Sequence, residues 1–206
     1  MEKNLIVEHY NKESVLEEIL NFSKDKWLAI VTQDGFFRRY YKHRPLKASS
    51  LAELKELIAM LRARSIFASV NLYNRLETVE DIDPRNVYAS TPTIDIDGSL
   101  ENWKSTIQVT KEIIHELNDL GVSKSIIVKW SGNGCHVHLN HKGFSKEILL
   151  KYNPVDLAYA IVELIIKRIE PKIFGENKGI KLENKIDDKR VFTCPLSFHR
   201  ELDVVC

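Results

Sequence analysis

The apolar positions in the first half of the chain predict two helices and three strands. One helix follows the candidate caps Asn11 and Ser14, because the apolar residues after them recur at helical spacing. A second helix opens at the capping-box match Ser50-Leu51-Ala52-Glu53 and reaches about Arg64. Three apolar runs are predicted as strands, the first two forming a hairpin: 27–32, 36–42 and 66–72.

The second half alternates helices and strands more regularly. One helix is predicted between Ser99 and Gly121 and another from Asn153 to about Glu170. Four apolar residues share a face of the first: Trp103, Ile107, Ile114 and Leu117. Short runs are predicted as strands: 93–97, 125–130, 135–140, 180–183, 190–193 and 202–206. This order favours an α/β (α+β) fold with a sheet backed by helices on one face.

Length, charge and cysteine spacing narrow the functional classes. The 206 residues leave room for one large domain, or for a core with a smaller appendage. The formal net charge is +1, so a nucleic-acid surface would have to be a local basic patch. Cys135, Cys194 and Cys206 lie far apart, so neither a structural zinc nor a disulfide framework is expected. With a charged start and no apolar run of about 18–20 residues, we expect a soluble, cytoplasmic (intracellular) protein.

Two aspartates lie at the end of a predicted strand, in Ile94-Asp95-Ile96-Asp97-Gly98. Because side chains alternate across a strand, Asp95 and Asp97 point to one face, about 7 Å apart along the strand. Such a pair can bridge hard divalent cations, Mg²⁺ or Mn²⁺, and a two-metal site stabilises both the attacking and the leaving oxygen in phosphoryl transfer. A solvated strand end before a glycine turn would show the same pattern.

A glycine-rich turn joins two later strands, in Ser131-Gly132-Asn133-Gly134-Cys135-His136-Val137-His138. Glycines let a turn approach a phosphate and point backbone N–H groups at it, and Ser131 adds a hydroxyl donor. His136 and His138 lie on one strand face, where imidazoles could contact a triphosphate or a metal. An ordinary glycine hairpin with two surface histidines is the simpler interpretation.

Two further segments carry basic residues. The segment 187–200 contains four residues of types that bind phosphate, although by itself it reads as a solvated loop: Arg190, Ser197, His199 and Arg200. The stretch 38–44 interleaves basic and aromatic residues, which suits phosphate neutralisation and base stacking. Its candidate nucleic-acid contacts are Arg38, Arg39, Lys42 and Arg44. A hairpin strand with Tyr40 in the core would look alike.

The order of these motifs resembles the archaeo-eukaryotic primase superfamily, which includes the small catalytic subunit of DNA primases and related primase-polymerase domains. In that family an acidic pair, a Ser-Gly-x-Gly-x-His turn and an Arg…Pro-x-Ser-x-His segment follow one another. Asp95 and Asp97 match the acidic pair, and residues 131–136 match the turn. The third motif is matched by Arg190, Pro195, Ser197 and His199.

The resemblance implies a single primase-polymerase catalytic domain over 1–206, with an N-terminal α/β module over about 1–85 and an RRM-like catalytic module over about 86–206. The active cleft of such enzymes lies between the modules. Members join NTPs or dNTPs on a DNA template or primer–template with two metals, Mg²⁺ or Mn²⁺, and no covalent enzyme intermediate, in replication or repair. A large primase subunit, a helicase or a ligase domain can be their partner, and no membrane is involved.

Several departures from the family pattern bear on the kind of member. The turn lacks the arginine usual in replicative primases and is closer to ligase-associated and plasmid-type members. Thr193 stands near the place of another usual arginine, and Arg200-Glu201-Leu202 replaces a lysine and Thr-Gly. The chain also stops inside the predicted strand 202–206, as a truncated protein would. These departures question priming without a primer, not the general chemistry.

A two-metal site calls for a further carboxylate beside the aspartate pair, and the family supplies it upstream of the Pro-x-Ser-x-His segment. Three residues are candidates: Glu183, Asp187 and Asp188. Asp187 and Asp188 follow Ile186, which matches the family's habit of a hydrophobic residue before the aspartate. Glu183 follows Leu182 on the predicted strand 180–183 and has the better spacing to Pro195. Glu183 is therefore preferred, with Asp187 as a near equal.

Two other functions remain open from the sequence. A rolling-circle Rep or relaxase endonuclease of the HUH type would hold one metal with His136 and His138 and use Tyr152 or Tyr159 as nucleophile. That reading leaves the glycine turn and the Ser-x-His segment unexplained. A nucleotide-binding or nucleic-acid-binding module of the same fold without turnover is the second alternative. Metal-dependent incorporation of nucleotides distinguishes both from a polymerase.

Overall fold

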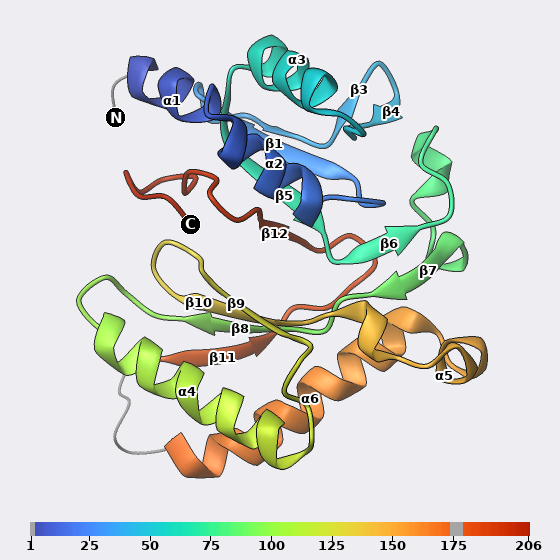
Figure 1. Ribbon diagram of the computed structural model, residues 1–206, viewed down its shortest axis with the longest axis vertical. Helices are drawn as coiled ribbons and strands as arrows, with labels where there is room; N and C mark the ends of the chain where they lie inside the picture. Colours follow the sequence, from blue (N-terminus) through green and yellow to red (C-terminus); the bar gives the residue numbers. More distant parts are fainter. Residues whose placement is uncertain (1–2, 174–178) are drawn as a thin grey trace. The chain divides into compact units, whose positions relative to one another are not determined.

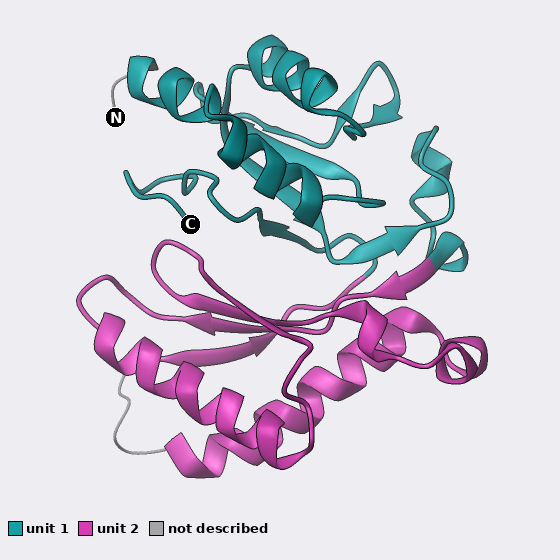
Figure 2. Ribbon diagram, in the orientation of Figure 1, with its two compact units in different colours: residues 1–87, 188–206 teal, residues 88–187 magenta. Residues whose placement is uncertain are grey.

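Helices and antiparallel sheets form two units in the computed structural model, which describes residues 3–173 and 179–206. Unit 1 consists of residues 1–87 and 188–206, and unit 2 of residues 88–187 (Figure 2). The mixture of helices with antiparallel strands confirms the α+β class. None of the helices within the described ranges has both the length and the apolar character needed to cross a membrane.

Unit 1 contains a four-stranded sheet with the order β12-β5-β1-β2. Its strands are β1 (Leu28–Thr32), β2 (Phe37–Arg38), β5 (Ala63–Ser69) and β12 (Val191–Thr193). Its helices are α1 (Lys3–Tyr10), α2 (Glu13–Phe22) and α3 (Leu51–Leu61) (Figure 1). Ile30 of β1 pairs with Ile66 of β5, and both are buried in one apolar core with Leu16 of α2 and Leu54 of α3. Sheet and helices therefore share this core.

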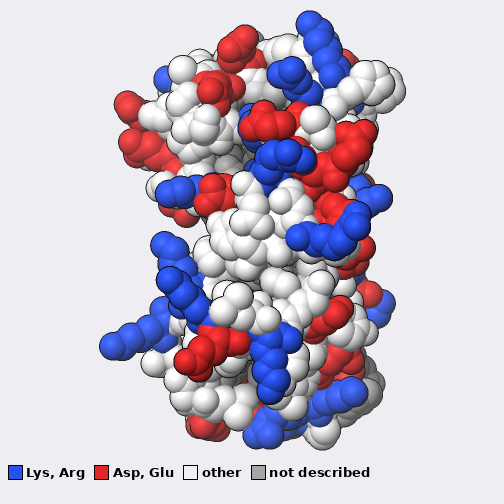
Figure 3. Space-filling view, turned by 90° about the vertical axis from the view of Figure 1, so that its right-hand side faces the viewer, with Lys and Arg blue, Asp and Glu red and all other residues white. Residues whose placement is uncertain are grey.

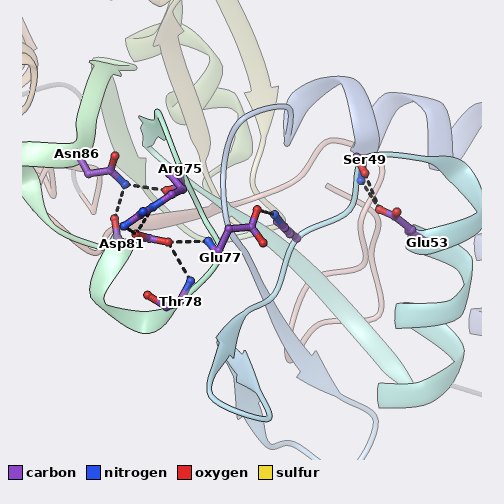
Figure 4. A network of polar contacts seen from close by, with 8 residues as sticks. Ser49, Glu53, Arg75, Glu77, Thr78, Asp81 and Asn86 are labelled. Atoms are coloured by element: carbon purple, nitrogen blue, oxygen red, sulfur yellow. Dashed lines mark hydrogen bonds and ion pairs between the residues drawn. The ribbon is translucent and has the colours of Figure 1, made fainter.

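The two helices expected in the first half are confirmed, but their ends depend on other residues. At the start of α3, the hydroxyl of Ser50 accepts a hydrogen bond from the Glu53 N–H at 3.2 Å. The Glu53 carboxylate in turn accepts from the N–H and hydroxyl of Ser49, not from Ser50 (Figure 4). Lys12 takes the N-cap position of α2 in place of Asn11 or Ser14, and its side chain makes no capping hydrogen bond. Helix α1 was not predicted.

The predicted strand 36–42 is formed only in part: it pairs with β1 as the expected hairpin, but it is interrupted at Arg39 and the chain reverses direction at Lys42 and His43. Strand β2 ends at Arg38, and a separate hairpin follows, formed by β3 (Tyr40–Tyr41) and β4 (Arg44–Pro45). The two residues of its turn, Lys42 and His43, have positive φ angles of 48° and 60°. Two central residues with positive φ match a two-residue type I′ turn, which fits the twist of paired strands. A lysine and a histidine are uncommon there, so the sequence did not reveal the turn.

A polar stretch between β6 (Asn71–Tyr73) and β7 (Val87–Ser90) is held together by one buried carboxylate. Asp81 accepts hydrogen bonds from the N–H groups of Thr78 and Glu77 and from the Arg75 side chain, at 2.7–2.9 Å (Figure 4). The two N–H groups lower the pKa of Asp81 below its ordinary value, more than the ion pair with Arg75 does. Asn86 closes the stretch by donating to the carbonyls of Arg75 and Asp81.

Unit 2 follows the order strand–helix–strand–strand–helix–strand. Its elements are β8 (Thr93–Asp97), α4 (Trp103–Asp119), β9 (Ile126–Trp130), β10 (Cys135–Leu139), α5 (Lys146–Lys151), α6 (Pro154–Ile173) and β11 (Lys181–Asn184). The sheet order is β11-β8-β10-β9, and each neighbouring pair is antiparallel. This is the split βαβ arrangement of RRM-like modules. Figure 1 shows α4 and α6 against the same face of this sheet.

Strand register separates the two faces of this sheet. Residues directly opposite each other on paired strands project from the same face. Ile94 pairs with Val137 and both are fully buried, as expected for the face on which α4 and α6 pack. Asp95 pairs with His136 on one side and with Glu183 on the other, so these three polar side chains share the opposite face. The face without helices thus carries these polar side chains.

Three expectations for the second half need correction. Helix α4 begins at Trp103 after the N-cap Asn102, and its buried face contains Val109 and Ile113, while Trp103 and Ile107 are exposed. The predicted strand 202–206 is only a single bridge between Phe198 and Val205. The tail from 188 onwards belongs to unit 1, because β12 pairs with β5, whereas the sequence placed it in the module 86–206.

Candidate functional site

Three carboxylates gather on the polar face of the unit 2 sheet. Asp95 and Asp97 extend from β8, and Glu183 extends from the neighbouring strand β11. One oxygen from each lies within 4.8 Å of the others. Among the described acidic, histidine and cysteine side chains, these three lie close enough together to share a metal ion. The group includes neither Asp187 nor Asp188. The structure therefore brings the preferred third carboxylate to the pair.

Lys185 places its ammonium group among these three carboxylates. Its Nζ lies 2.9 Å from Oδ2 of Asp95 and 2.8 Å from Oδ2 of Asp97, and it also forms an ion pair with Oε2 of Glu183. Partial burial disfavours the charged form, but the hydrogen bonds to Asp97, Glu183 and Asp95 outweigh it and raise the pKa of Lys185 above its ordinary value. The ammonium is therefore charged at neutral pH.

The same contacts set the ionisation of the two aspartates. Burial opposes the charge on Asp95, but the hydrogen bonds from His136 and Lys185 outweigh it and lower its pKa. Asp97 behaves in the opposite way, because partial burial and its hydrogen bond with Glu183 raise its pKa. The same hydrogen bond lowers the pKa of Glu183, so the two carboxyl groups share a proton that rests on Asp97 even with the Lys185 ammonium beside them.

The two histidines of β10 are oriented by β8. His136 Nε2 lies 3.3 Å from Oδ1 of Asp95, and burial together with the charge of Lys129 lowers the pKa of His136 to about 4. The imidazole is therefore neutral at pH 7 and donates to Asp95. His138 Nδ1 lies 2.8 Å from the hydroxyl of Thr93, which itself donates to the carbonyl of Thr91. That arrangement assigns the Nδ1 proton to His138 and leaves Nε2 as an acceptor.

The glycine turn packs tightly against the aspartate strand. The Ser131 N–H donates to the Gly134 carbonyl at 2.8 Å, and Gly132 has a positive φ of 110°. A Cβ atom on Gly134 would lie 2.0 Å from the carbonyl oxygen of Ile96, between Asp95 and Asp97. Gly134 is therefore required by the close approach of two backbones. The contact of Ser131, Gly132 and Asn133 with a phosphate stays a prediction.

The third motif lies in unit 1, and its residues differ in accessibility. Ser197 is completely buried, and its hydroxyl accepts a hydrogen bond from the Ile66 N–H at 2.7 Å and lies 3.1 Å from the Tyr10 hydroxyl. We therefore correct its interpretation as a nucleotide ligand: Ser197 anchors the segment to β5. His199 is half-buried, and its Nδ1 accepts from the N–H groups of Glu201 and Leu202.

The protonation of His199 follows from those contacts. Because Nδ1 accepts two backbone hydrogen bonds, the neutral imidazole carries its proton on Nε2. Burial and the neighbouring charge of Arg200 lower the pKa of His199, so the ring is neutral at pH 7. Arg200 is exposed next to Glu201, and Arg190 is half-buried with its carbonyl accepting from the Val70 N–H. Of the candidate donors of this segment, Arg200 is therefore exposed, while Arg190 and His199 are both half-buried.

The basic stretch of unit 1 is accompanied by exposed aromatic rings that the sequence did not single out. Phe36 and Phe37 are 59% and 44% exposed, more than expected for phenylalanine. Arg38 stacks over Phe36, and Arg39 lies between the rings of Trp27 and Phe37. The remaining cations of the stretch, Lys42 and Arg44, are exposed on the β3–β4 hairpin. Exposed basic and aromatic side chains therefore follow one another along this stretch.

Outside this stretch, charge gives little guidance to a binding surface. On the face shown in Figure 3, basic and acidic side chains are interspersed with uncharged ones. This agrees with the net charge of +1. Neither sign of charge dominates the visible face, so a nucleic-acid-binding surface would depend on a local cluster of basic side chains.

The arrangement of unit 2 does not suit the relaxase alternative. His136 and His138 project from the sheet face opposite to the one covered by α6. Tyr159 lies on α6, and Tyr152 ends α5, so neither tyrosine is on the strand face of the histidines. Moreover, His136 is turned to Asp95 and His138 to Thr93. Neither of these two tyrosines is therefore placed to act as a nucleophile beside a metal held by His136 and His138.

Sequence reasoning missed two lysines of the site. Lys185 follows Glu183 by two residues, so strand periodicity could have placed it on the same face. Lys129 pairs with His136 across β9 and β10 and is only 6% exposed. A lone lysine in an apolar strand gives no signal of its own, because burial of Lys129 depends on its partners in space.

Comparison with known proteins places the fold. No protein-family model matches the sequence, and no curated protein matches it either. The fold is shared with a polymerase domain of known structure. The chain is similar to the polymerase domain of Ligase D from Mycobacterium tuberculosis, solved in complex with DNA, with a TM-score of 0.68 and 14% identity over 95% of this chain and 76% of that chain. At this identity the likeness concerns the fold alone.

Proposed function

We propose that the chain is a template-directed nucleotidyltransferase of the primase-polymerase type, which joins NTPs or dNTPs in DNA replication or repair. The observation that carries this proposal is the carboxylate cluster of Asp95, Asp97 and Glu183 on the polar face of unit 2. Its setting supports the reaction class, because the chain has the fold of a polymerase domain. A fold alone does not define a reaction, so the residues of the site decide.

The donor set of this cluster fits Mg²⁺ or Mn²⁺. Three carboxylates within 4.8 Å offer hard oxygen ligands, and the ammonium of Lys185 among them supports a site that favours positive charge. Bound divalent cations would supply charge stabilisation to the transferring phosphoryl group. The neutral His136 donates to Asp95 and so holds that carboxylate in its orientation.

We propose nucleotide contacts in each of the two units, and the units are considered separately. In unit 2, we propose the Ser131–Gly134 turn, His136 and His138 as contacts of the incoming nucleotide. In unit 1, His199 with its Nε2 proton and the exposed Arg200 supply donors suited to phosphate oxygens. Arg190 is the further basic residue of this segment.

A direct assay tests the proposed function. The purified chain is incubated with a primer–template or an unprimed single-stranded template, labelled dNTPs or NTPs, and Mg²⁺ or Mn²⁺. Extension that requires both template and metal is expected. Nucleotide binding without incorporation in any combination would favour a binding module over an enzyme.

The basic and aromatic surface of unit 1 is the proposed DNA contact. The similar polymerase domain was solved with DNA, which supports this role. We predict that replacing Arg38, Lys42 and Arg44 together by alanine weakens binding to single-stranded DNA. Each lost phosphate contact should reduce the slope of log affinity against log salt by about 0.7. Fluorescence anisotropy at several salt concentrations measures both, and an unchanged slope contradicts the assignment.

A pair of variants separates nucleotide binding from folding in the third motif. Ser197→Ala leaves the buried Ile66 N–H without its acceptor, so it should lower the unfolding free energy by about 1–3 kcal/mol while nucleotide affinity in the folded protein is retained. His199→Ala should weaken nucleotide affinity with a smaller change in stability. Urea unfolding and nucleotide titration measure the two effects. If Ser197→Ala remains fully stable but loses nucleotide, its hydroxyl contacts the ligand after all.

A further inference from the structure

Lys185 holds the place that a metal ion would take in the carboxylate cluster. Its Nζ contacts one oxygen from each of Asp95, Asp97 and Glu183, the same three side chains that form the candidate metal centre. A lysine ammonium has three N–H donors, which matches three carboxylate acceptors. The cluster therefore already contains a counter-ion belonging to the chain.

A divalent cation bound by these three carboxylates would compete with this ammonium for their oxygens. Mg²⁺ binds carboxylate oxygens at about 2.0–2.1 Å, so it would enter the space between the carboxylates where Nζ lies. Two cations a few ångströms apart repel each other, and water screens that repulsion poorly at a partly buried site. The Lys185 side chain is 27% exposed, which leaves a route for the ammonium to move outward.

We propose that Lys185 is a built-in counter-ion of the metal centre, which holds the three carboxylates together when metal is absent and is displaced when a divalent cation binds. This inference rests on the proposed metal site and adds a positioning residue to it. Lys185 stabilises the metal-free cluster, since three carboxylates without a cation repel one another. By the same interaction it raises the metal concentration that the protein needs.

The chain offers a matched control in Lys181. Lys181 pairs with the same Glu183, but only through Oε1, from a side chain that is 73% exposed. It contacts neither aspartate in the described ion pairs. A general loss of one positive charge near the cluster is therefore reproduced by Lys181→Met, whereas loss of the central ammonium requires Lys185→Met.

Titration with Mn²⁺ alone, followed by calorimetry and by electron paramagnetic resonance of free Mn²⁺, tests the proposal. Lys185→Met should bind Mn²⁺ about tenfold more tightly than wild type, while Lys181→Met and Lys185→Arg stay close to wild type. In EDTA, Lys185→Met should melt several degrees lower than wild type and Lys181→Met, and saturating Mn²⁺ should remove that difference.

The outcomes separate this inference from the proposed function. If wild type binds Mn²⁺ and Lys185→Met binds it equally or more weakly, Lys185 does not compete with metal and the inference is wrong, while the metal centre stands. Equal melting temperatures of Lys185→Met and wild type in EDTA also overturn it. If neither protein binds Mn²⁺ at millimolar concentration, the metal centre itself is refuted, and the counter-ion role fails with it.

Discussion

Replacing Asp97 by asparagine is expected to reduce template-directed nucleotide incorporation by at least about a thousandfold. Removal of one metal-binding charge typically costs several kcal/mol of transition-state stabilisation, and each 1.36 kcal/mol is about tenfold in rate. Asparagine keeps the size of the side chain but loses the charge. The Asp97 side chain is 42% exposed and ends β8, so the fold should survive the change.

Asp97 is a better position for this experiment than Asp95. Asp95 is only 5% exposed and contacts both His136 and Lys185, so its replacement would also disturb the sheet. A matched control is Asp119→Asn, an exposed aspartate at the end of α4. Incorporation rates in Mg²⁺ and in Mn²⁺, with circular dichroism of each variant, measure the effect. Near-wild-type incorporation by Asp97→Asn would remove this carboxylate from the reaction.

The elements of unit 2 could be predicted from the sequence because their signals are local. The alternation around Asp95 marks β8 with the bounds that the structure has, and Gly121 ends α4 with a positive φ of 80°. Asn153 caps α6 by accepting from the Val155 N–H at 2.8 Å. Each of these features depends on residues within one turn or one strand. No distant partner was needed.

Features that depend on partners far along the chain could not be predicted. Ser197 is a phosphate-binding residue type, but its hydroxyl serves Ile66, which is 131 positions away. Lys42 and His43 adopt left-handed angles that their residue types do not suggest. The buried face of α4 is set by the sheet beneath it, so Trp103 is exposed despite its apolar spacing. Tertiary context overrides local pattern at these positions.

The position of the third carboxylate depends both on local sequence spacing and on strand pairing in the folded sheet. Strand spacing and distance to Pro195 favoured Glu183, and register confirms its position, because Glu183 pairs directly with Asp95 across β11 and β8. The sequence could not exclude Asp187, because Ile186 before it matches the family's habit of a hydrophobic residue before the aspartate. Asn184 ends β11, which leaves Asp187 outside the sheet. Register, a property of the folded sheet, brings Glu183 rather than Asp187 beside Asp95.

Replacing Gly134 by alanine is expected to lower the unfolding free energy by more than about 3 kcal/mol. A Cβ atom there would lie 2.0 Å from the Ile96 carbonyl oxygen, far inside contact distance. The clashing atom belongs to the backbone of β8, and Ile96 pairs with Cys135, so neither strand can retreat without loss of pairing. Since Ile96 stands between Asp95 and Asp97, any folded Gly134→Ala protein should also bind Mn²⁺ more weakly.

Gly143→Ala is the matched control for this prediction. A Cβ atom on Gly143 would meet the Ser125 hydroxyl at 3.0 Å, and that side chain can rotate away, so only a small change in stability is expected. Thermal and urea unfolding of both variants, with Mn²⁺ titration of whichever folds, measures the difference. A Gly134→Ala protein that melts with wild type would mean that the turn does not pack against β8 as described. The glycine at position 134 would then be explained by the phosphate contact that its motif first indicated, made through backbone N–H groups, and not by close packing.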